Sequence, residues 1–215
     1  MITIVNCKAY AEATGKKAVK LAKVCESVAK ATKSRIAIAV QAADISAVAN
    51  AVSIPVFAQH VDAIEFGAHT GWTLPESVQE AGAVGSLINH SELRVPEELV
   101  QKTVQRLRNL GILSVVCAAN PVEEERLAKF KPDMVAVEPP ELIGGKISVS
   151  KARPEVISES VRRVRGIPIL VGAGIHTAED VATAKRLGAQ GILVASGVVL
   201  AKNPKKALLE LMKGF

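Results

Sequence analysis

The chain alternates short apolar runs with longer segments of helical periodicity, and this alternation limits the fold more than any other feature of the sequence. The runs are rich in valine, isoleucine, leucine and alanine, which is typical of strands buried on both faces. The predicted strands are Ile2–Asn6, Ile36–Val40, Ile54–Ala58, Val84–Asn89, Leu113–Ala118, Met134–Val137, Pro168–Val171 and Gly191–Val194. The predicted helices are Gly15–Ala31, Asp44–Ala51, Pro75–Ala81, Pro96–Asn109, Pro121–Phe130, Pro154–Val164, Thr177–Leu187 and a last segment from Pro204.

Eight strand-then-helix units in succession predict an α/β protein folded as a closed (β/α)8 barrel. An open doubly wound sheet is the alternative, although it usually needs fewer strands. Local signals agree with the helix boundaries. Thr177 and Asp180 resemble a capping pair, and Gly111, Gly166 and Gly188 follow helices where a left-handed cap is favoured. Prolines fit the first helical turn at Pro75, Pro96, Pro121, Pro154 and Pro204.

The chain has 215 residues, which suits one domain over 1–215. That is short for this barrel, whose typical length is about 250 residues. The segments after the second and fifth predicted strands look shortened. Apolar residues make up 49% of the chain but aromatic residues only 3%, so aliphatic side chains must build the core.

The net charge of +6 is compatible with nucleic acid, an anionic membrane or a small anionic ligand. Many of the lysines are spread along the first predicted helix instead of forming a dense block, and few aromatic residues are available to stack on bases. We therefore predict no nucleic-acid partner. No stretch is long and apolar enough for a membrane span, and three cysteines without metal-ligand spacing favour a reducing, cytoplasmic location.

Polar side chains follow several predicted strands at the point where each one ends. In a parallel barrel these carboxyl ends meet on one rim, and the active sites of barrel enzymes lie at that rim. Lys8, His90 and Glu138 follow the first, fourth and sixth strands and can converge on one small substrate. Burial at a strand end should raise the pKa of Glu138. The following segment begins with two prolines and ends with two glycines, so it has a stiff and a flexible hinge, as a lid would need.

The ends of the seventh and eighth strands are rich in small residues. Backbone N–H groups are accessible in such turns, and a helix that follows adds positive potential. This is the usual place for a phosphate in a barrel. The two turns are Gly172-Ala173-Gly174 and Ala195-Ser196-Gly197.

Four motifs, in this order on an eight-unit chain, resemble the triosephosphate isomerase family, and the reduced length resembles its archaeal members. The resemblance covers the whole chain, including the lid segment. The motifs are Asn6-Cys7-Lys8, Gly67-Ala68-His69-Thr70-Gly71, Asn89-His90-Ser91-Glu92 and Glu138-Pro139-Pro140-Glu141-Leu142-Ile143-Gly144.

The resemblance implies an intramolecular aldose–ketose isomerase of glycolysis and gluconeogenesis that interconverts dihydroxyacetone phosphate and glyceraldehyde 3-phosphate through an enediolate. It implies no cofactor and no metal. The family is a standard example of a glutamate base paired with a neutral histidine, and these roles fall to Glu138 and His90. Lys8 becomes the cation that attracts the substrate, and Asn6 orients Lys8 or contacts the substrate. The role of Glu92 stays open between substrate chemistry and a structural ion pair.

The resemblance also implies a phosphate grip made of the backbone N–H groups of Ile143, Gly144, Gly174, Ala195 and Ser196.

The chain departs from the wider family at three places. Glycine replaces a serine at Gly174, so only its main chain can contribute. Glutamate replaces the tryptophan of the lid at Glu141, and Leu93 takes the place of one of two arginines after the histidine motif.

The resemblance further implies a homo-oligomer, expected to be a homotetramer. The loop around Thr70 would then reach the active site of a neighbouring subunit.

Three other functions are compatible with parts of the sequence. A lyase or synthase barrel of indole or thiamine biosynthesis would also use the small-residue turns, but it would need a larger pocket. A non-enzymatic barrel should have lost at least one of the catalytic groups, and none is missing. A nucleic-acid role has only the basic charge in its favour.

Overall fold

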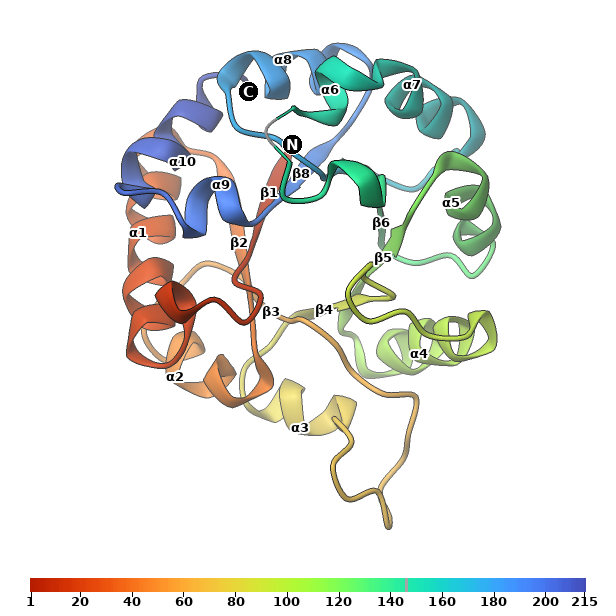
Figure 1. Ribbon diagram of the computed structural model, residues 1–215. Coiled ribbons are helices and arrows are strands. Elements are labelled where there is room, and N and C mark those ends of the chain that lie inside the picture. Colours follow the sequence, from red (N-terminus) through yellow and green to blue (C-terminus); the bar gives the residue numbers. More distant parts are fainter. Residues whose placement is uncertain (146) are drawn as a thin grey trace.

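The eight strands form one closed parallel barrel, in which each strand pairs with the next and β8 pairs with β1. The computed structural model describes residues 1–145 and 147–215. Figure 1 shows the barrel with its helices arranged around the outside. The predicted (β/α)8 fold is confirmed. The strands are β1 Ile2–Asn6, β2 Arg35–Val40, β3 Val56–Ala58, β4 Gly85–Ile88, β5 Leu113–Ala118, β6 Met134–Val137, β7 Ile169–Val171 and β8 Gly191–Val194.

The helices between the strands differ in length: α1 and α4 have 17 and 14 residues, whereas α2 and α5, which follow the second and fifth strands, have only 5 and 8. No helix in the described ranges is both long and apolar enough to cross a membrane. The α-helices are α1 Lys16–Thr32, α2 Ile45–Ala49, α3 Pro75–Glu80, α4 Glu97–Leu110, α5 Pro121–Ala128, α6 Val149–Ala152, α7 Pro154–Arg163, α8 Ala178–Arg186, α9 Ser196–Val199 and α10 Pro204–Met212. Three 3-10 turns are η1 Ala11–Ala13, η2 Ala42–Asp44 and η3 Pro140–Leu142.

The helix ends follow the sequence signals with two corrections. Gly166 does not cap α7, because that helix ends at Arg163 and its C-cap is Val164 in an extended conformation. Pro96 does not lie in the first turn of α4, because its ψ of 146° is extended, and it is the residue immediately before the helix. The capping box predicted at Thr177 is present: its hydroxyl accepts from the Asp180 N–H, and the Asp180 carboxylate accepts from the Thr177 N–H. Aspartate therefore replaces the usual glutamate in this motif.

Two four-residue helices were not predicted, because neither is long enough to show a helical period. Helix α6 follows the lid segment, and α9 directly follows β8. Helix α9 starts at Ser196, so the expected small-residue turn of the eighth strand leads into a short helix before α10.

Side chains of the strands alternate between the barrel interior and the layer under the helices. Ile4, Leu87 and Leu170 belong to the interior cluster, whereas their neighbours on the same strands pack against the helices. Phe57 on β3 lies opposite Gly85 on β4, and a β-carbon at Gly85 would overlap the phenyl ring. Thus the single large aromatic ring of the interior cluster requires a glycine beside it.

Glu124 on α5 is a fully buried carboxyl group outside the barrel. Neither of its oxygens has a hydrogen-bond partner among the described residues, and burial raises its pKa to about 7. A carboxyl in such surroundings is stable only when it is neutral.

We expect Glu124→Gln to stabilise the protein above neutral pH. The folded state of the wild type binds this proton more tightly than the unfolded chain does. The stability that the proton provides is complete below about pH 4.5 and is lost as pH rises through about 7. The neutral amide should remove this loss, which is on the order of 3 kcal/mol at pH 8.5. Urea unfolding of both proteins at pH 5 and pH 8.5 measures the loss of unfolding free energy between these pH values. An equal loss in the wild type and the variant would contradict the prediction.

Candidate active site

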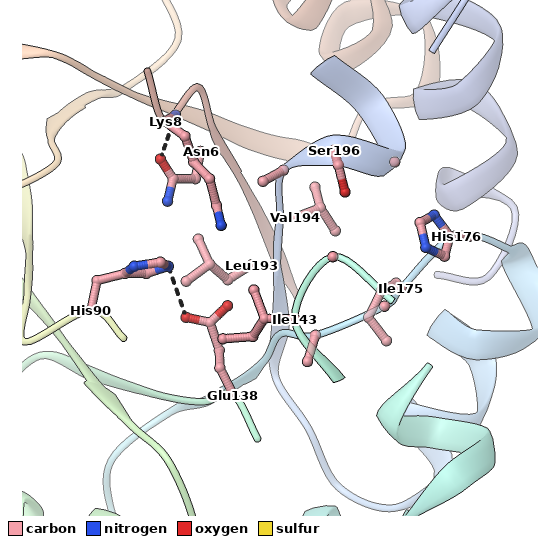
Figure 2. A pocket seen from close by; sticks show the side chains of 15 residues that line it. Asn6, Lys8, His90, Glu138, Ile143, Ile175, His176, Leu193, Val194 and Ser196 are labelled. Carbon is pink, nitrogen blue, oxygen red and sulfur yellow. Dashed lines mark hydrogen bonds and ion pairs between the residues drawn. The ribbon is translucent and has the colours of Figure 1, made fainter. Parts of the chain in front are cut away.

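One cavity lies at the carboxyl ends of the strands, and every site residue predicted from the sequence lines it. These residues come from five different strand ends and from the lid (Figure 2). Predicted from the sequence were Asn6, Lys8, His90, Glu138, Ile143, Gly144, Gly174, Ala195 and Ser196; the structure adds Ala173, Ile175, His176, Leu193, Val194 and Gly197.

The turn after β1 positions Lys8 through a network of hydrogen bonds. Lys8 has a φ of 47°, which a residue with a side chain seldom adopts. The Asn6 side-chain oxygen accepts from the Lys8 N–H at 3.0 Å and from the Gln59 amide at 3.1 Å. Gln59 also donates to the Lys8 carbonyl at 3.0 Å. Gln59, which follows β3 and was not predicted, therefore holds the turn together with Asn6.

The Lys8 ammonium lies 2.7 Å from a carboxylate oxygen of Glu92. The Lys8 side chain is only 11% exposed, whereas that of Glu92 is 56% exposed. Among the described residues that line the cavity, Lys8 is the only lysine or arginine. Its charge lies in a largely buried place, where it attracts an anion more strongly than a surface lysine would.

His90 is held by contacts on both sides of its ring. The preceding Asn89 has a φ of 61°, and its side chain donates to the Cys117 carbonyl and accepts from the Val95 N–H. His90 Nδ1 accepts from the Glu92 N–H at 3.2 Å, so in the neutral ring the proton lies on Nε2. Burial, with the nearby Lys8 charge, lowers the pKa of His90. His90 therefore presents a neutral Nε2–H donor to the cavity.

Glu138 faces that donor, with its Oε2 atom 3.4 Å from His90 Nε2. Its backbone N–H donates to the Ala118 carbonyl, which continues the pairing of β6 with β5. Burial raises the pKa of Glu138 to about 7, although the Lys8 charge opposes the rise. A β-carbon at Gly172 would overlap the Glu138 carboxyl group, so glycine is required there. The result is a carboxyl group held in place with a pKa close to neutral.

The lid segment leaves Glu138 through Pro139 and the η3 turn and reaches the cavity again at its far end. Gly144 has a φ of 70°, which favours glycine. The Glu141 carboxylate lies 2.6 Å from the Arg153 guanidinium, and both side chains are about half exposed. This ion pair lies at the surface, where such a pair contributes little stability.

The predicted phosphate side of the cavity combines the end of the lid with the turns after β7 and β8. Ala173 and Gly174 both have a φ of 69°, which turns the chain sharply after β7. Ser196 begins α9, and the first N–H groups of a helix have no partner within it. His176 completes this side, and sequence reasoning missed it because it lies beyond the glycine turn.

Arg94 keeps one of the two charged positions that follow the histidine motif in the wider family. It forms an ion pair with the buried Glu123 and contacts the Asn89 carbonyl. Leu93, at the other position, is exposed. The remaining arginine therefore ties the loop that carries His90 to α5.

A metal centre has no support in residues 1–145 and 147–215. No group of three or more histidine, cysteine, aspartate or glutamate side chains is arranged there to hold a metal ion.

Comparisons with known proteins agree with this geometry. A family model of triosephosphate isomerase matches residues 1–214. Triosephosphate isomerase of Archaeoglobus fulgidus is 49% identical over 98% of this chain and 96% of its own length. The enzymes named triosephosphate isomerase of Methanobacterium bryantii and Methanothermobacter thermautotrophicus are 48% and 47% identical, over 98% of this chain and 95% and 94% of their own lengths. The chain belongs to the triosephosphate isomerase family, whose members are isomerases of triose phosphates.

Proposed function

We propose that this chain interconverts dihydroxyacetone phosphate and D-glyceraldehyde 3-phosphate through an enediolate, without a cofactor or metal. The observation that carries the proposal is the pair formed by the buried Glu138 carboxyl and the neutral His90 Nε2–H, 3.4 Å apart beside the Lys8 charge. The reaction belongs to glycolysis and gluconeogenesis. A lyase, a synthase and a nucleic-acid binder have no comparable observation in their favour.

Glu138 acts as the base. It removes a proton from the carbon beside the carbonyl, and the electron pair of the broken C–H bond moves toward the carbonyl oxygen to give the enediolate. A base with a pKa of about 7 is effective at neutral pH because a large fraction of it is ionised while it still binds a proton well. The protonated Glu138 then gives its proton to the former carbonyl carbon. The hydroxyl proton on the first carbon moves to the former carbonyl oxygen, so that the first carbon becomes the new carbonyl.

His90 acts as the electrophile. Its Nε2–H donates to the oxygen on which negative charge develops, and Lys8 stabilises the same charge. Asn6 keeps the Lys8 turn in place through its hydrogen bond to the Lys8 N–H. Family members are a standard example of a glutamate base beside a neutral histidine, and the lowered pKa of His90 supports the same assignment in this chain.

The phosphate is held by main-chain N–H groups of the lid and of the turns after β7 and β8. These groups do not change charge during the reaction, so they hold the substrate without competing for its proton. The lid keeps water from the enediolate, a function for which this family is a standard example. The N–H groups are those of Ile143, Gly144, Gly174, Ala195 and Ser196.

We also propose a cytoplasmic homotetramer in which the loop around Thr70 contacts a neighbouring subunit. The loop between β3 and α3 extends away from the barrel (Figure 1). Its Phe66 and Trp72 side chains are 76% and 56% exposed, which is unusual for aromatic rings without a partner. The described cysteines are all unpaired, as is common in a reducing compartment.

We expect Glu138→Ala to nearly abolish isomerisation of glyceraldehyde 3-phosphate and Glu138→Asp to reduce it strongly. Removing a general base costs about 10²- to 10⁴-fold in rate, and aspartate places its carboxylate one methylene further back. A coupled assay of kcat and KM measures both variants. Glu98→Ala, an exposed carboxylate on α4, is the control with wild-type activity. An alanine variant that retains wild-type turnover would contradict the assignment.

We expect kcat/KM to fall as pH is lowered through about 7, because the raised pKa leaves Glu138 protonated below that value. Ionisation of the substrate phosphate near pH 6 adds a separate effect. Titration of the ¹³C-labelled carboxyl groups of the free enzyme, with Glu138→Gln to assign the signal, separates the two. A Glu138 signal that titrates below pH 5 would show the base to be an ordinary carboxylate.

We expect the wild type to have the mass of four chains of 22.6 kDa in light scattering at micromolar concentration. Replacing Phe66 and Trp72 by serine should shift the protein to smaller species, because these rings would lose their apolar contacts with the neighbour. The control replaces the exposed Val122 on α5 by serine, which also removes exposed apolar surface but should leave the tetramer intact. A monomeric wild type would rule out the tetramer.

A further inference from the structure

His176 lies on the phosphate side of the cavity, and its backbone is firmly held. Its N–H donates to the Asp180 carboxylate at 3.1 Å, at the start of α8. The other oxygen of Asp180 accepts from the Ser148 hydroxyl at 2.6 Å. Burial opposes the charge on Asp180, but the hydrogen bonds from Ser148, His176 and Thr177 outweigh it and lower its pKa. One buried carboxylate thus anchors both His176 and the segment that follows the lid.

The His176 ring contacts the end of the lid directly. Its Nε2 atom lies 3.0 Å from the carbonyl oxygen of Gly145. A carbonyl oxygen can only accept, so the proton of the ring lies on Nε2 and is donated to the lid. Figure 2 shows His176 on the side of the cavity away from His90, beyond Ile175. Its hydrogen bonds among the described residues join it to Asp180 and Gly145 and not to His90 or Glu138.

The Nδ1 and Cε1 atoms of the same ring pack on the main chain where α9 begins. A β-carbon at Gly197 would lie 2.6 Å from His176 Nδ1, so no side chain could be placed between them. The imidazole thus fills the space between the end of the lid and the turn after β8. Both segments supply backbone N–H groups to the proposed phosphate site.

The hydrogen bond from His176 to the Gly145 carbonyl matters because the lid ends in two glycines. Glycine loses more conformational freedom than any other residue when it is fixed, and this loss reduces the affinity for a ligand that needs an ordered segment. A restraint on the Gly145 carbonyl limits the orientations of the peptides just before it, which carry the Ile143 and Gly144 N–H groups. Gly174, on the facing turn, has no side chain that could provide such a restraint.

We propose that His176 is a positioning residue for the phosphate: by binding the Gly145 carbonyl it preorganises the lid N–H groups that grip the substrate. This inference rests on the proposed function. His176 touches no reacting atom, so its effect should depend on whether the substrate carries a phosphate group.

The test compares His176→Leu, which keeps the bulk and removes the donor, with His176→Gln, whose amide N–H can reach the same carbonyl. For glyceraldehyde 3-phosphate, kcat/KM should fall about tenfold in the leucine variant, the size of one hydrogen bond. The Kd of 2-phosphoglycolate should rise by the same factor. The glutamine variant should recover most of the kcat/KM and most of the affinity for 2-phosphoglycolate. Slow turnover of glyceraldehyde, which lacks the phosphate, should not change in either variant.

Equal losses with glyceraldehyde and its phosphate would show that His176 only supports the fold of the site, and wild-type values in both variants would show that it has no role. Either result overturns the inference while leaving the isomerase proposal intact. A wild type without isomerase activity would instead overturn the proposed function. If the leucine variant does not fold, ¹⁵N NMR of histidine-labelled wild type decides: an unprotonated His176 Nε2 contradicts the donor role.

Discussion

The burial of a carboxyl group at the end of β6 is the constraint on which the rest of the site depends. Glu138 can occupy its place only because Gly172, directly after the neighbouring strand β7, has no β-carbon. Burial raises the pKa of Glu138, and the Lys8 charge limits the rise. In the proposed reaction a lower value would give a weaker base, whereas a higher one would leave the carboxyl protonated at neutral pH. The balance between burial and the opposing Lys8 charge therefore governs how well Glu138 would serve as the proposed base.

Several of the turns at the strand ends have strained backbone. Lys8, Asn89 and Ala173 each have a positive φ, which costs on the order of 1 kcal/mol for a residue with a side chain. Hydrogen bonds from Asn6 and Gln59 hold the first turn, and the Asn89 side chain holds the second. Three of the five described non-glycine residues with positive φ thus lie where the chain leaves a strand beside the cavity, and the other two, Lys33 and Lys131, lie just after helices.

The sequence was sufficient for the barrel and for the placing of His90 and Glu138 in one cavity, because both depend on local patterns. An apolar run predicts a strand wherever it lies, and the barrel rule then places His90 and Glu138 on one rim. Contacts between distant segments could not be predicted in this way. Gln59 binds a turn more than fifty residues before it, and His176 binds the lid 31 residues before it. Neither residue type is unusual at its position, so only the fold reveals the contact.

The lid shows how the chain compensates for its departures from the wider family. Glycine at 174 removes a hydroxyl group that could hold the closed lid, and Glu141 leaves the N-terminal hinge with an exposed ion pair to Arg153. Such a pair contributes little because solvent screens it and two long side chains must be ordered. The hydrogen bond from His176 is different, because a buried carboxylate already fixes its backbone. The restraint on the lid therefore lies mainly at its C-terminal end, next to the N–H groups that face the phosphate.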